Sequence, residues 1–264
     1  MLKLSHVYKT FNKGTVNEKQ ALIDINLQLN PGDFVTIIGG NGAGKSTLLN
    51  LIAGVYPCDG GNIFVDDTDV TRLKEYKRAR FLGRVFQDPM RGTAGDMNIE
   101  ENLAIAYRRG KPRTLRWGIT PEERKLYHDR LSTLDLGLED RMTSKVGLLS
   151  GGQRQALTLL MATLQKPKLL LLDEHTAALD PKTADTVLKH TNEIVTGQHL
   201  TALMVTHNMH HAIELGNRII MMDGGKILFD ISGEDKKHLK VEDLLKRFQN
   251  AEGKELDNDR MLLN

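Results

Sequence analysis

The sequence predicts an α/β fold with a largely parallel sheet, because short runs of apolar residues alternate with longer stretches of helical pattern. The run Phe34–Ile38 is rich in β-branched residues and ends at a glycine-rich turn, which is typical of a buried strand. The apolar runs Leu169–Leu172 and Leu203–Thr206 predict two further strands of the same kind. This alternation of strands and helices indicates one α/β core rather than a bundle or a sandwich.

Antiparallel strands are expected at both ends of this core. Ile219–Met222 and Lys226–Phe229 flank the sequence Asp223-Gly224-Gly225, a strong turn signal, and together predict a closing hairpin. Within the first thirty residues, Leu2–Leu4 and Ile23–Leu29 alternate in polarity. They are consistent with an antiparallel layer that precedes the core.

The middle and the end of the chain are helical in pattern. Pro121–Leu138 is charged, and Thr120 stands before it as an N-cap, followed by acidic residues that favour the positive helix end. We expect residues 90–160, roughly, to be a helical insertion into the core. Near the C-terminus an amphipathic helix is predicted, followed by a polar tail over residues 251–264. The apolar face of that helix is formed by Val241, Leu244, Leu245 and Phe248.

Composition limits the possible classes of protein. The 264 residues are 40% hydrophobic and 27% charged, which is ordinary for a folded domain with a sizeable core. Lys and Arg number 36 against 34 Asp and Glu, so a histone-like, charge-driven nucleic-acid binder is not indicated. The single cysteine, Cys58, cannot form an intramolecular disulfide. No secretory signal and no apolar run of roughly 20 residues is visible, so we expect a chain that is soluble by itself.

A phosphate-binding loop follows the first buried strand. Residues 39–46 fit the pattern G-x-x-x-x-G-K-[ST], between a strand and a helix predicted to begin at Thr47. Glycines let backbone N–H groups converge on phosphate oxygens, and the helix adds its positive end. The motif assigns Lys45 to the β and γ phosphates and the Ser46 hydroxyl to Mg²⁺. The residues expected to contact the nucleotide here are Gly39, Asn41, Gly42, Ala43, Gly44, Lys45, Ser46 and Thr47.

Two carboxylates follow the second buried strand. Asp173 is expected to hold Mg²⁺, usually through water, and Glu174 is placed to polarise an attacking water molecule. An apolar strand that ends in two acidic residues, taken by itself, is a strand that merely meets solvent about as often as it is part of a functional site. Because the chain also carries a phosphate loop, we favour the catalytic interpretation.

The sequence Leu149-Ser150-Gly151-Gly152-Gln153 narrows the class of nucleotide-binding protein. With it, the chain resembles the ATP-binding cassette of an ABC transporter. Six elements follow one another in the order of that family across nearly the whole chain. They are the phosphate loop, Gln87 after a strand, the Leu149–Gln153 motif, the acidic strand, Asp180 in Ala178-Leu179-Asp180, and His207 after a strand.

The resemblance implies a role for each of these elements. Ser150 begins a helix, so its side chain and the amides of Gly151 and Gly152 form an anion site. In the family, two cassettes pack head to tail, and this site closes over ATP bound to the other copy, with Gln153 part of the same motif. By resemblance, Gln87 senses Mg²⁺ and the attacking water and links to the membrane subunit. His207 is implied to contact the γ-phosphate, and Asp180 to organise the dimer seam.

An aromatic residue near the N-terminus is implied to stack on adenine. Phe11 aligns best with the position that the family uses, and Tyr8 is the alternative because the register near a terminus is uncertain. Stacking on a base contributes roughly 1–3 kcal/mol, so either ring would be useful.

Three other features have more than one interpretation. His207, His210 and His211 invite a metal-site interpretation, which the absence of nearby Cys or carboxylate ligands disfavours. The basic segment 107–117 is either a solvated loop or a contact with acidic lipid head groups or a permease, through Arg108, Arg109 and Arg113. His175 stands after Glu174 where most cassettes have Pro. Its ring either tunes the pKa of Glu174 or points to solvent.

The resulting hypothesis is one ABC-type ATPase subunit that uses ATP and Mg²⁺. The core is predicted over about residues 1–89 and 161–233, the helical subdomain over 90–160, and a C-terminal helix and tail over 234–264. The run from Asp173 to Asp180 resembles bacterial amino-acid importers. The implied partners are a second copy of the chain, permease subunits and an extracytoplasmic solute-binding protein, which would place the chain at the cytoplasmic face of the membrane. A two-component exporter, or an ABC protein acting on ribosomes or DNA, remains the alternative.

Overall fold

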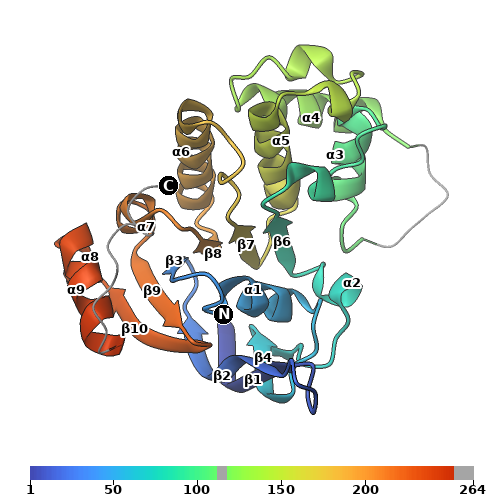
Figure 1. Cartoon of the computed structure of the whole chain (residues 1–264). Coiled ribbons are helices and arrows are strands. Elements are labelled where there is room, and N and C mark those ends of the chain that lie inside the picture. Colours follow the sequence, from blue (N-terminus) through green and yellow to red (C-terminus); the bar gives the residue numbers. More distant parts are fainter. Residues whose placement is uncertain (112–117, 253–264) are drawn as a thin grey trace. The chain divides into compact units, whose positions relative to one another are not determined.

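The computed structural model describes residues 1–111 and 118–252, with side chains in the last stretch as far as Arg247. The chain divides into two compact units (Figure 1). The first unit consists of residues 1–78 and the chain from Thr201 onward, and the second unit of residues 79–200. Within the described residues, no helix is long and apolar enough to cross a bilayer. The predicted tail beyond residue 252, and the predicted side-chain role of Phe248, lie outside this description.

The first unit contains an antiparallel sheet, as the alternating N-terminal segments predict. Its strand order is β2-β1-β4-β5. Residues of β1 alternate between buried and exposed on either side of a register shift between Leu4 and Val7, so that Leu2 and Leu4 are buried before the shift and Val7 after it. The strands are β1 (Leu2–Phe11), β2 (Lys19–Leu29), β4 (Gly60–Val65) and β5 (Thr68–Asp69).

The same unit holds the strand that leads into the phosphate loop. β3 (Phe34–Ile38) is buried along its whole length and lies between two parallel neighbours, β8 (Thr201–Val205) and β9 (Arg218–Asp223). β10 (Lys226–Ser232) pairs antiparallel with β9 and confirms the predicted hairpin, with Gly224 and Gly225 at positive φ in its turn. The predicted strand Leu203–Thr206 corresponds to β8, which starts two residues earlier and ends one residue earlier than predicted.

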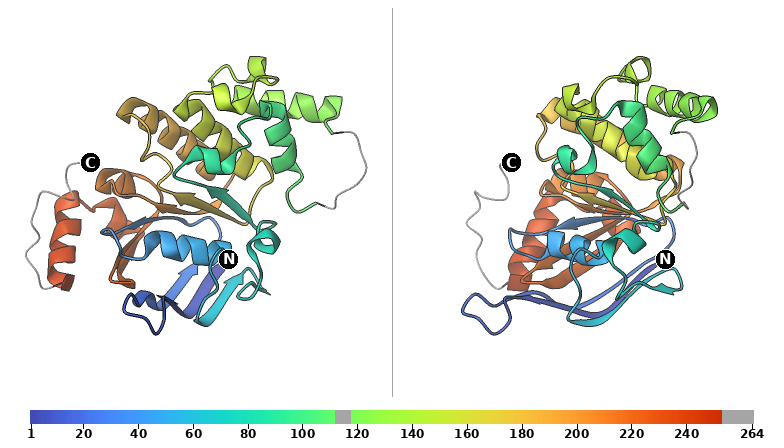
Figure 2. Two further views of the ribbon diagram at one scale, coloured as in Figure 1. Left: turned by 45° about the vertical axis from the view of Figure 1, so that its right-hand side comes forward. Right: turned by 90° about the vertical axis from the view of Figure 1, so that its right-hand side faces the viewer.

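Helices pack against the strands of this unit. α1 (Lys45–Ala53), the blue helix in Figure 2, contacts β2 of the antiparallel sheet. It begins two residues before the predicted Thr47. α7 (Met209–Glu214) packs on β3 and on α9 (Val241–Glu252), while the short α8 (Glu234–Lys237) lies against β10. Val241, Leu244 and Leu245 of α9 join one apolar cluster with β9 and β10, which confirms the predicted amphipathic face as far as it is described.

In the second unit, two parallel strands carry the other motifs. β6 (Leu82–Val85) pairs with β7 (Leu169–Asp173), and α6 (Pro181–Gly197) packs against α5 (Gly151–Leu164). α3 (Ile99–Tyr107) and α4 (Pro121–Ser132) also pack against α5, around a core that includes the fully buried Tyr127. α5 continues beyond residue 160, where the sequence-based boundary of the helical subdomain falls.

The predicted helix over Pro121–Leu138 is wrong at its C-terminal end. Its start is confirmed, because Thr120 accepts a hydrogen bond from the Glu123 amide and the Glu123 carboxylate accepts one from the Thr120 amide. The helix ends at Ser132, and Asp135 and Gly137 then adopt positive φ. That turn directs Leu134 and Leu138 into the core. The burial of these apolar side chains, and not helical periodicity, therefore determines the conformation of the segment after Ser132.

A buried arginine fixes the C-terminal end of the phosphate-loop helix. The Arg78 guanidinium is 1% exposed and donates to the carbonyls of Leu51 and Ile52 at 2.8 and 2.9 Å, within the last turn of α1. It also donates to Leu73 and Thr71 in the segment that precedes α2 (Glu75–Arg78). Burial lowers the pKa of Arg78. The positive charge of Arg78 offsets the negative end of the helix dipole. The N–H groups of its guanidinium satisfy carbonyls at the helix end that have no helical partner.

Substitution Arg78→Met should lower the free energy of unfolding by about 3 kcal/mol, because four carbonyls, two of them in buried hydrogen bonds, lose a charged donor. Urea denaturation followed by circular dichroism measures the change. Lys77→Met, at the exposed neighbouring position, is the control and should stay within about 0.5 kcal/mol of wild type. Equal stability of the two variants would show that Arg78 does not hold α1.

Candidate functional site

The phosphate loop joins β3 to α1 in a backbone path that only glycine fits. A Cβ atom on Gly39, whose φ is +148°, would lie 2.1 Å from the Met222 carbonyl oxygen. One on Gly44, at φ +101°, would lie 2.6 Å from the Ala21 carbonyl oxygen. Both neighbours are backbone atoms, so no side-chain rearrangement could relieve these contacts. Gly39 and Gly44 are therefore needed for packing, besides the phosphate binding that the motif predicts.

The N-terminus of α1 has no side-chain cap. Its N-cap is Gly44, which provides no side-chain acceptor for the first amides of the helix. Lys45 is 5% exposed and donates to the carbonyls of Gly39 and Gly40 at 2.8 and 3.0 Å, so its ammonium lies within the loop. Ala43 is buried, whereas Asn41 and Ser46 are exposed. The cationic and hydroxyl groups that the motif predicts are thus held at one helix end.

His207 lies at the same edge of the sheet as the phosphate loop. Ile37 of β3 is the register partner of Val205 in the parallel strand β8. Gly39 and His207 each follow these partners by two residues, so both leave the carboxyl ends of adjacent strands, where α/β sheets bind ligands. His207 is exposed at this edge. Among the described residues, no group of three or more His, Cys, Asp and Glu side chains is placed to hold a metal ion.

Phe11 and Tyr8 have different surroundings in the antiparallel sheet. The half-buried Phe11 ring packs edge-on against Tyr56, with centroids 5.2 Å apart, and the Lys9 ammonium lies 5.6 Å from its centroid. Tyr8 is 41% exposed, and desolvation together with a hydrogen bond to Asp24 raises its pKa. Tyr8 thus belongs to a polar group on the outside of the sheet. These surroundings favour Phe11 as the stacking ring.

In the second unit, the acidic residues and Gln87 share an edge. Val85 of β6 is the register partner of Leu172 in β7, so Gln87 and Glu174 each follow a partner by two residues. Asp173 ends β7, and the Arg84 guanidinium lies 3.6 Å from its carboxylate. Arg84 also stacks on Phe86 at 4.5 Å. Arg84 belongs to none of the motifs, although a charged residue within an apolar strand is a signal that could have indicated it.

Glu174 has an unusual backbone conformation. Its φ is +46°, in the left-handed region that non-glycine residues rarely adopt, and its carbonyl accepts a hydrogen bond from the Ala177 amide. A following proline would bias this residue toward extended conformations, so His175 at the next position leaves the left-handed conformation accessible.

His175 points into the protein and not to solvent. Its side chain is 2% exposed, and Nε2 lies 3.0 Å from the Thr191 hydroxyl of α6, which in turn donates to the Val187 carbonyl. Burial lowers the pKa of His175 to about 4. The alternative in which the ring faces solvent is therefore wrong, and the neutral imidazole links the segment after Glu174 to α6.

The Leu149–Gln153 motif forms a capped helix start beside Asp180. The Ser150 hydroxyl accepts from the Gln153 amide at 3.3 Å, and the Gln153 side chain accepts from the Ser150 amide at 3.2 Å. A Cβ on Gly152 would lie 2.2 Å from the Thr183 methyl group, and one on Gly151 would lie 3.3 Å from Leu179. Asp180 caps α6 by accepting from the Thr183 amide, and these bonds lower its pKa. The motif and Asp180 are therefore neighbours.

Two arginines of the basic segment have internal partners. Arg108 pairs with Glu123 at 2.9 Å and donates to the Ala104 carbonyl. Arg109 donates to the Gln165 carbonyl at 2.5 Å, and burial lowers its pKa. Arg113 and Trp117 lie outside the described residues. Because Arg108 and Arg109 make these contacts within the second unit, reversing their charge would disturb its packing as well as any contact with lipid or permease.

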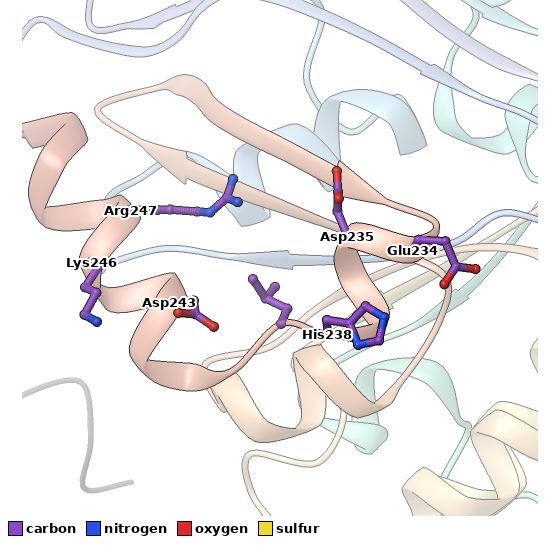
Figure 3. Close-up of a pocket in the computed structure, with 7 residues that line it drawn as sticks. Glu234, Asp235, His238, Asp243, Lys246 and Arg247 are labelled. Atoms are coloured by element: carbon purple, nitrogen blue, oxygen red, sulfur yellow. The ribbon is translucent and has the colours of Figure 1, made fainter.

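A separate pocket of about 350 Å³ lies beside α8 and α9 in the first unit (Figure 3). Glu234, Asp235 and Asp243 bring acidic groups to it, and Lys246 and Arg247 bring basic ones. None of the predicted site residues lines this pocket.

Comparisons with known proteins agree with this set of elements. A profile of the family described as ABC transporter matches residues 22–177. The tyrosine transport ATP-binding protein of Clostridioides difficile (strain R20291) is 43% identical over 95% of this chain and 100% of that protein. The phosphonates import ATP-binding protein PhnC of Lactococcus lactis subsp. cremoris (strain SK11) is 35% identical over 87% of this chain and 92% of that protein.

Solved structures show the same relationship. A dimeric bacterial ABC transporter cassette superposes with a TM-score of 0.75 at 29% identity, covering 88% of this chain and 98% of that one. A dimeric cassette in a post-hydrolysis state, bound to ADP and Pi, gives a TM-score of 0.75 at 28% identity, with the same coverage. The chain belongs to the ABC transporter family. It is an ATP-binding subunit of that family and an ATPase.

The buried His175 predicts a pH-dependent stability. Its pKa is about 4 in the folded chain against an ordinary value of 6.5, so only the unfolded chain binds this proton between those values. The stability that depends on the neutral ring is fully present above pH 6.5. It is lost progressively as the pH falls to 4, and the free energy of unfolding then drops by at most about 3 kcal/mol.

His175→Asn keeps a donor for Thr191 and removes the titration. Denaturant unfolding of both proteins between pH 7 and pH 4 should show the wild type losing stability relative to the variant. Parallel stability curves would contradict the burial of a neutral imidazole.

Proposed function

We propose that this chain is the ATP-hydrolysing subunit of a multi-component importer for a small solute, in the class of aromatic amino acids. The observation that carries the proposal is the full ordered set of cassette motifs, each at the strand or helix end where its chemistry is needed. The identity of 43% with a tyrosine transport protein, over nearly the whole length of both chains, supports the substrate class.

ATP would be held by the first unit. The amides at the start of α1, together with the Lys45 ammonium, suit the β and γ phosphates, and Phe11 presents a ring for adenine. The exposed His207 leaves the same edge of the sheet as the phosphate loop and is suited to the γ-phosphate.

Mg²⁺ fits the oxygen donors that the chain offers. The Ser46 hydroxyl, the Asp173 carboxylate and the Gln87 amide oxygen are hard ligands of the kind this ion prefers, with water and phosphate completing its shell. When bound, the ion neutralises charge that develops on the phosphate oxygens. The ion pair between Arg84 and Asp173 holds that carboxylate in place at the end of β7.

Hydrolysis would depend on Glu174 as the general base. Its carboxylate takes a proton from water as the water attacks the γ-phosphorus in line. The left-handed backbone of Glu174 sets the direction of the side chain, and the buried His175 next to it holds the following segment.

The Leu149–Gln153 motif suits ATP bound to a second copy of the chain. Ser150, Gly151 and Gly152 present a hydroxyl and helix amides, and Gly152 packs so closely on Thr183 that a side chain at this position would have to displace the Thr183 methyl group. Asp180 lies beside this motif, so one surface of the second unit would meet the partner. The dimeric cassettes that resemble this chain support a head-to-tail pair.

A small apolar patch in the second unit suits a permease. Met90 is 46% exposed and Leu148 is 73% exposed. Arg154 links their two segments by contacting the Met90 sulfur and donating to the Gly147 carbonyl. Met90 follows Gln87 by three residues, so contact here would reach the ATP site through one short segment. Binding to a permease would place the chain at the cytoplasmic membrane surface, and import would also require a solute-binding protein.

Substitution Glu174→Gln should reduce ATP turnover by about 10²–10⁴-fold, the usual contribution of a general base, and trap an ATP-bound dimer. Phosphate release and size-exclusion chromatography measure the two effects. In a strain lacking the gene, wild type should restore tyrosine uptake and Glu174→Gln should not. Near-normal turnover would overturn the assignment of Glu174, and unchanged uptake in the deletion strain would overturn the substrate class.

The paired change Met90→Asp and Leu148→Asp should uncouple the chain from its permease. We expect a smaller fraction of the chain to sediment with membranes and tyrosine uptake to fall, because charged groups replace the apolar patch. ATP affinity of the soluble protein should be preserved. Tyr76→Asp, at a residue 70% exposed in the first unit, is the control. Uptake at the wild-type level in the paired variant would exclude this patch as the docking site.

A further inference from the structure

Lys19 lies between the predicted adenine site and the phosphate loop. It begins β2 and is the register partner of Phe11 across the β1–β2 pair. A Cβ atom built on Gly42 would lie 3.3 Å from the Lys19 ammonium. The charged end of Lys19 therefore lies beside the backbone of the phosphate loop, although this residue is no part of the loop motif.

The Lys19 ammonium is available to a ligand. Its side chain is exposed, and in the part of the chain that the structure describes it has no hydrogen bond or ion pair. The adjacent Glu18 is engaged elsewhere, since its carboxylate accepts from the Gly14 amide at 2.6 Å. Lys9 differs, because it is 8% exposed and paired with Asp59 at 3.0 Å. Of these two lysines near Phe11, Lys19 is the one with a free charge.

The chemistry of a nucleotide matches this position. If adenine stacks on Phe11 and the terminal phosphates occupy the loop, the ribose and the α-phosphate must cross the space between them. Side chains opposite each other on antiparallel strands lie about 5 Å apart at Cβ, so Lys19 is a direct neighbour of the stacking ring. A cation at this point can contact phosphate oxygens before the loop begins.

We propose that Lys19 is a nucleotide-binding residue that contacts the phosphate chain at its α-phosphate end. This inference rests on the proposed ATP site and extends it by one residue. Lys45 acts on the terminal phosphates, whereas Lys19 acts on the part of the phosphate chain nearest the ribose. It also ties the antiparallel sheet to nucleotide binding by charge, in addition to ring stacking.

The test is the affinity of the purified full chain for ATP, measured by isothermal titration calorimetry at low salt. Lys19→Ala should weaken binding by about tenfold, the size expected for one hydrogen bond to a charged group. Lys19→Arg, which keeps the charge, should restore most of the affinity. The difference between wild type and Lys19→Ala should shrink as salt rises, because exposed charges are screened.

Lys3→Ala is the matched control. Lys3 is an exposed lysine of the same sheet, eight residues before Phe11 along β1 and so roughly 27 Å away along the strand. It should bind ATP like wild type. Lys45→Ala should lose affinity whether or not Lys19 contributes, and 2′-deoxy-ATP separates a phosphate contact from a ribose contact.

Equal losses for ATP and 2′-deoxy-ATP in Lys19→Ala would support a phosphate contact. A loss confined to ATP would place Lys19 on the ribose hydroxyl and overturn the inference. Wild-type affinity in Lys19→Ala, with binding lost in Lys45→Ala, would overturn the role of Lys19 and leave the proposed function intact. Absence of ATP binding by the wild type would instead overturn the proposed function.

Discussion

The close approach of backbone to backbone around the phosphate loop is the constraint on which the rest of the first unit depends. Gly39 lies against the carbonyl of Met222 and Gly44 against that of Ala21, with no room for a side chain at either point. These contacts bring β9, β2 and the start of α1 together. Arg78 holds the opposite end of α1 through the carbonyls of Leu51 and Ile52. The helix whose first amides are proposed to bind phosphate is thus fixed at both ends.

In the second unit, the candidate site residues lie on short segments that follow strands or begin helices. The structure has to hold these segments in a fixed orientation. Glu174 adopts a left-handed backbone, and the segment after it is anchored by the buried His175 on Thr191 of α6. Asp180 caps the same helix, whose first turn packs on Gly152. One helix, α6, therefore connects the acidic residues to the Leu149–Gln153 motif. The dehydrated, neutral state of His175 is what lets a polar ring perform this structural role.

Much of this arrangement could be predicted from local pattern. The strand Phe34–Ile38, the hairpin around Gly224 and the capped start at Thr120 follow from burial periodicity and turn chemistry, which act over a few residues. The end of α4 could not be predicted, because Leu134 and Leu138 turn into a core made by distant helices. The sequence predicts a solvated loop, or a contact with lipid or permease, for Arg108 and Arg109, yet within the second unit their partners are Glu123 and the Gln165 carbonyl.

The sequence by itself determined the chemistry of the site. The spacing of glycines, Lys45, Asp173, Glu174 and Ser150 predicts the proposed phosphate binding and hydrolysis, because local patterns locate the strand and helix ends at which these residues stand. Only the tertiary structure decided which other residues contact and support them. The burial of His175, the ion pair of Arg84 with Asp173, and the position of Lys19 beside Gly42 each join segments far apart in the chain. Such contacts depend on strand register and side-chain packing, which no local pattern encodes.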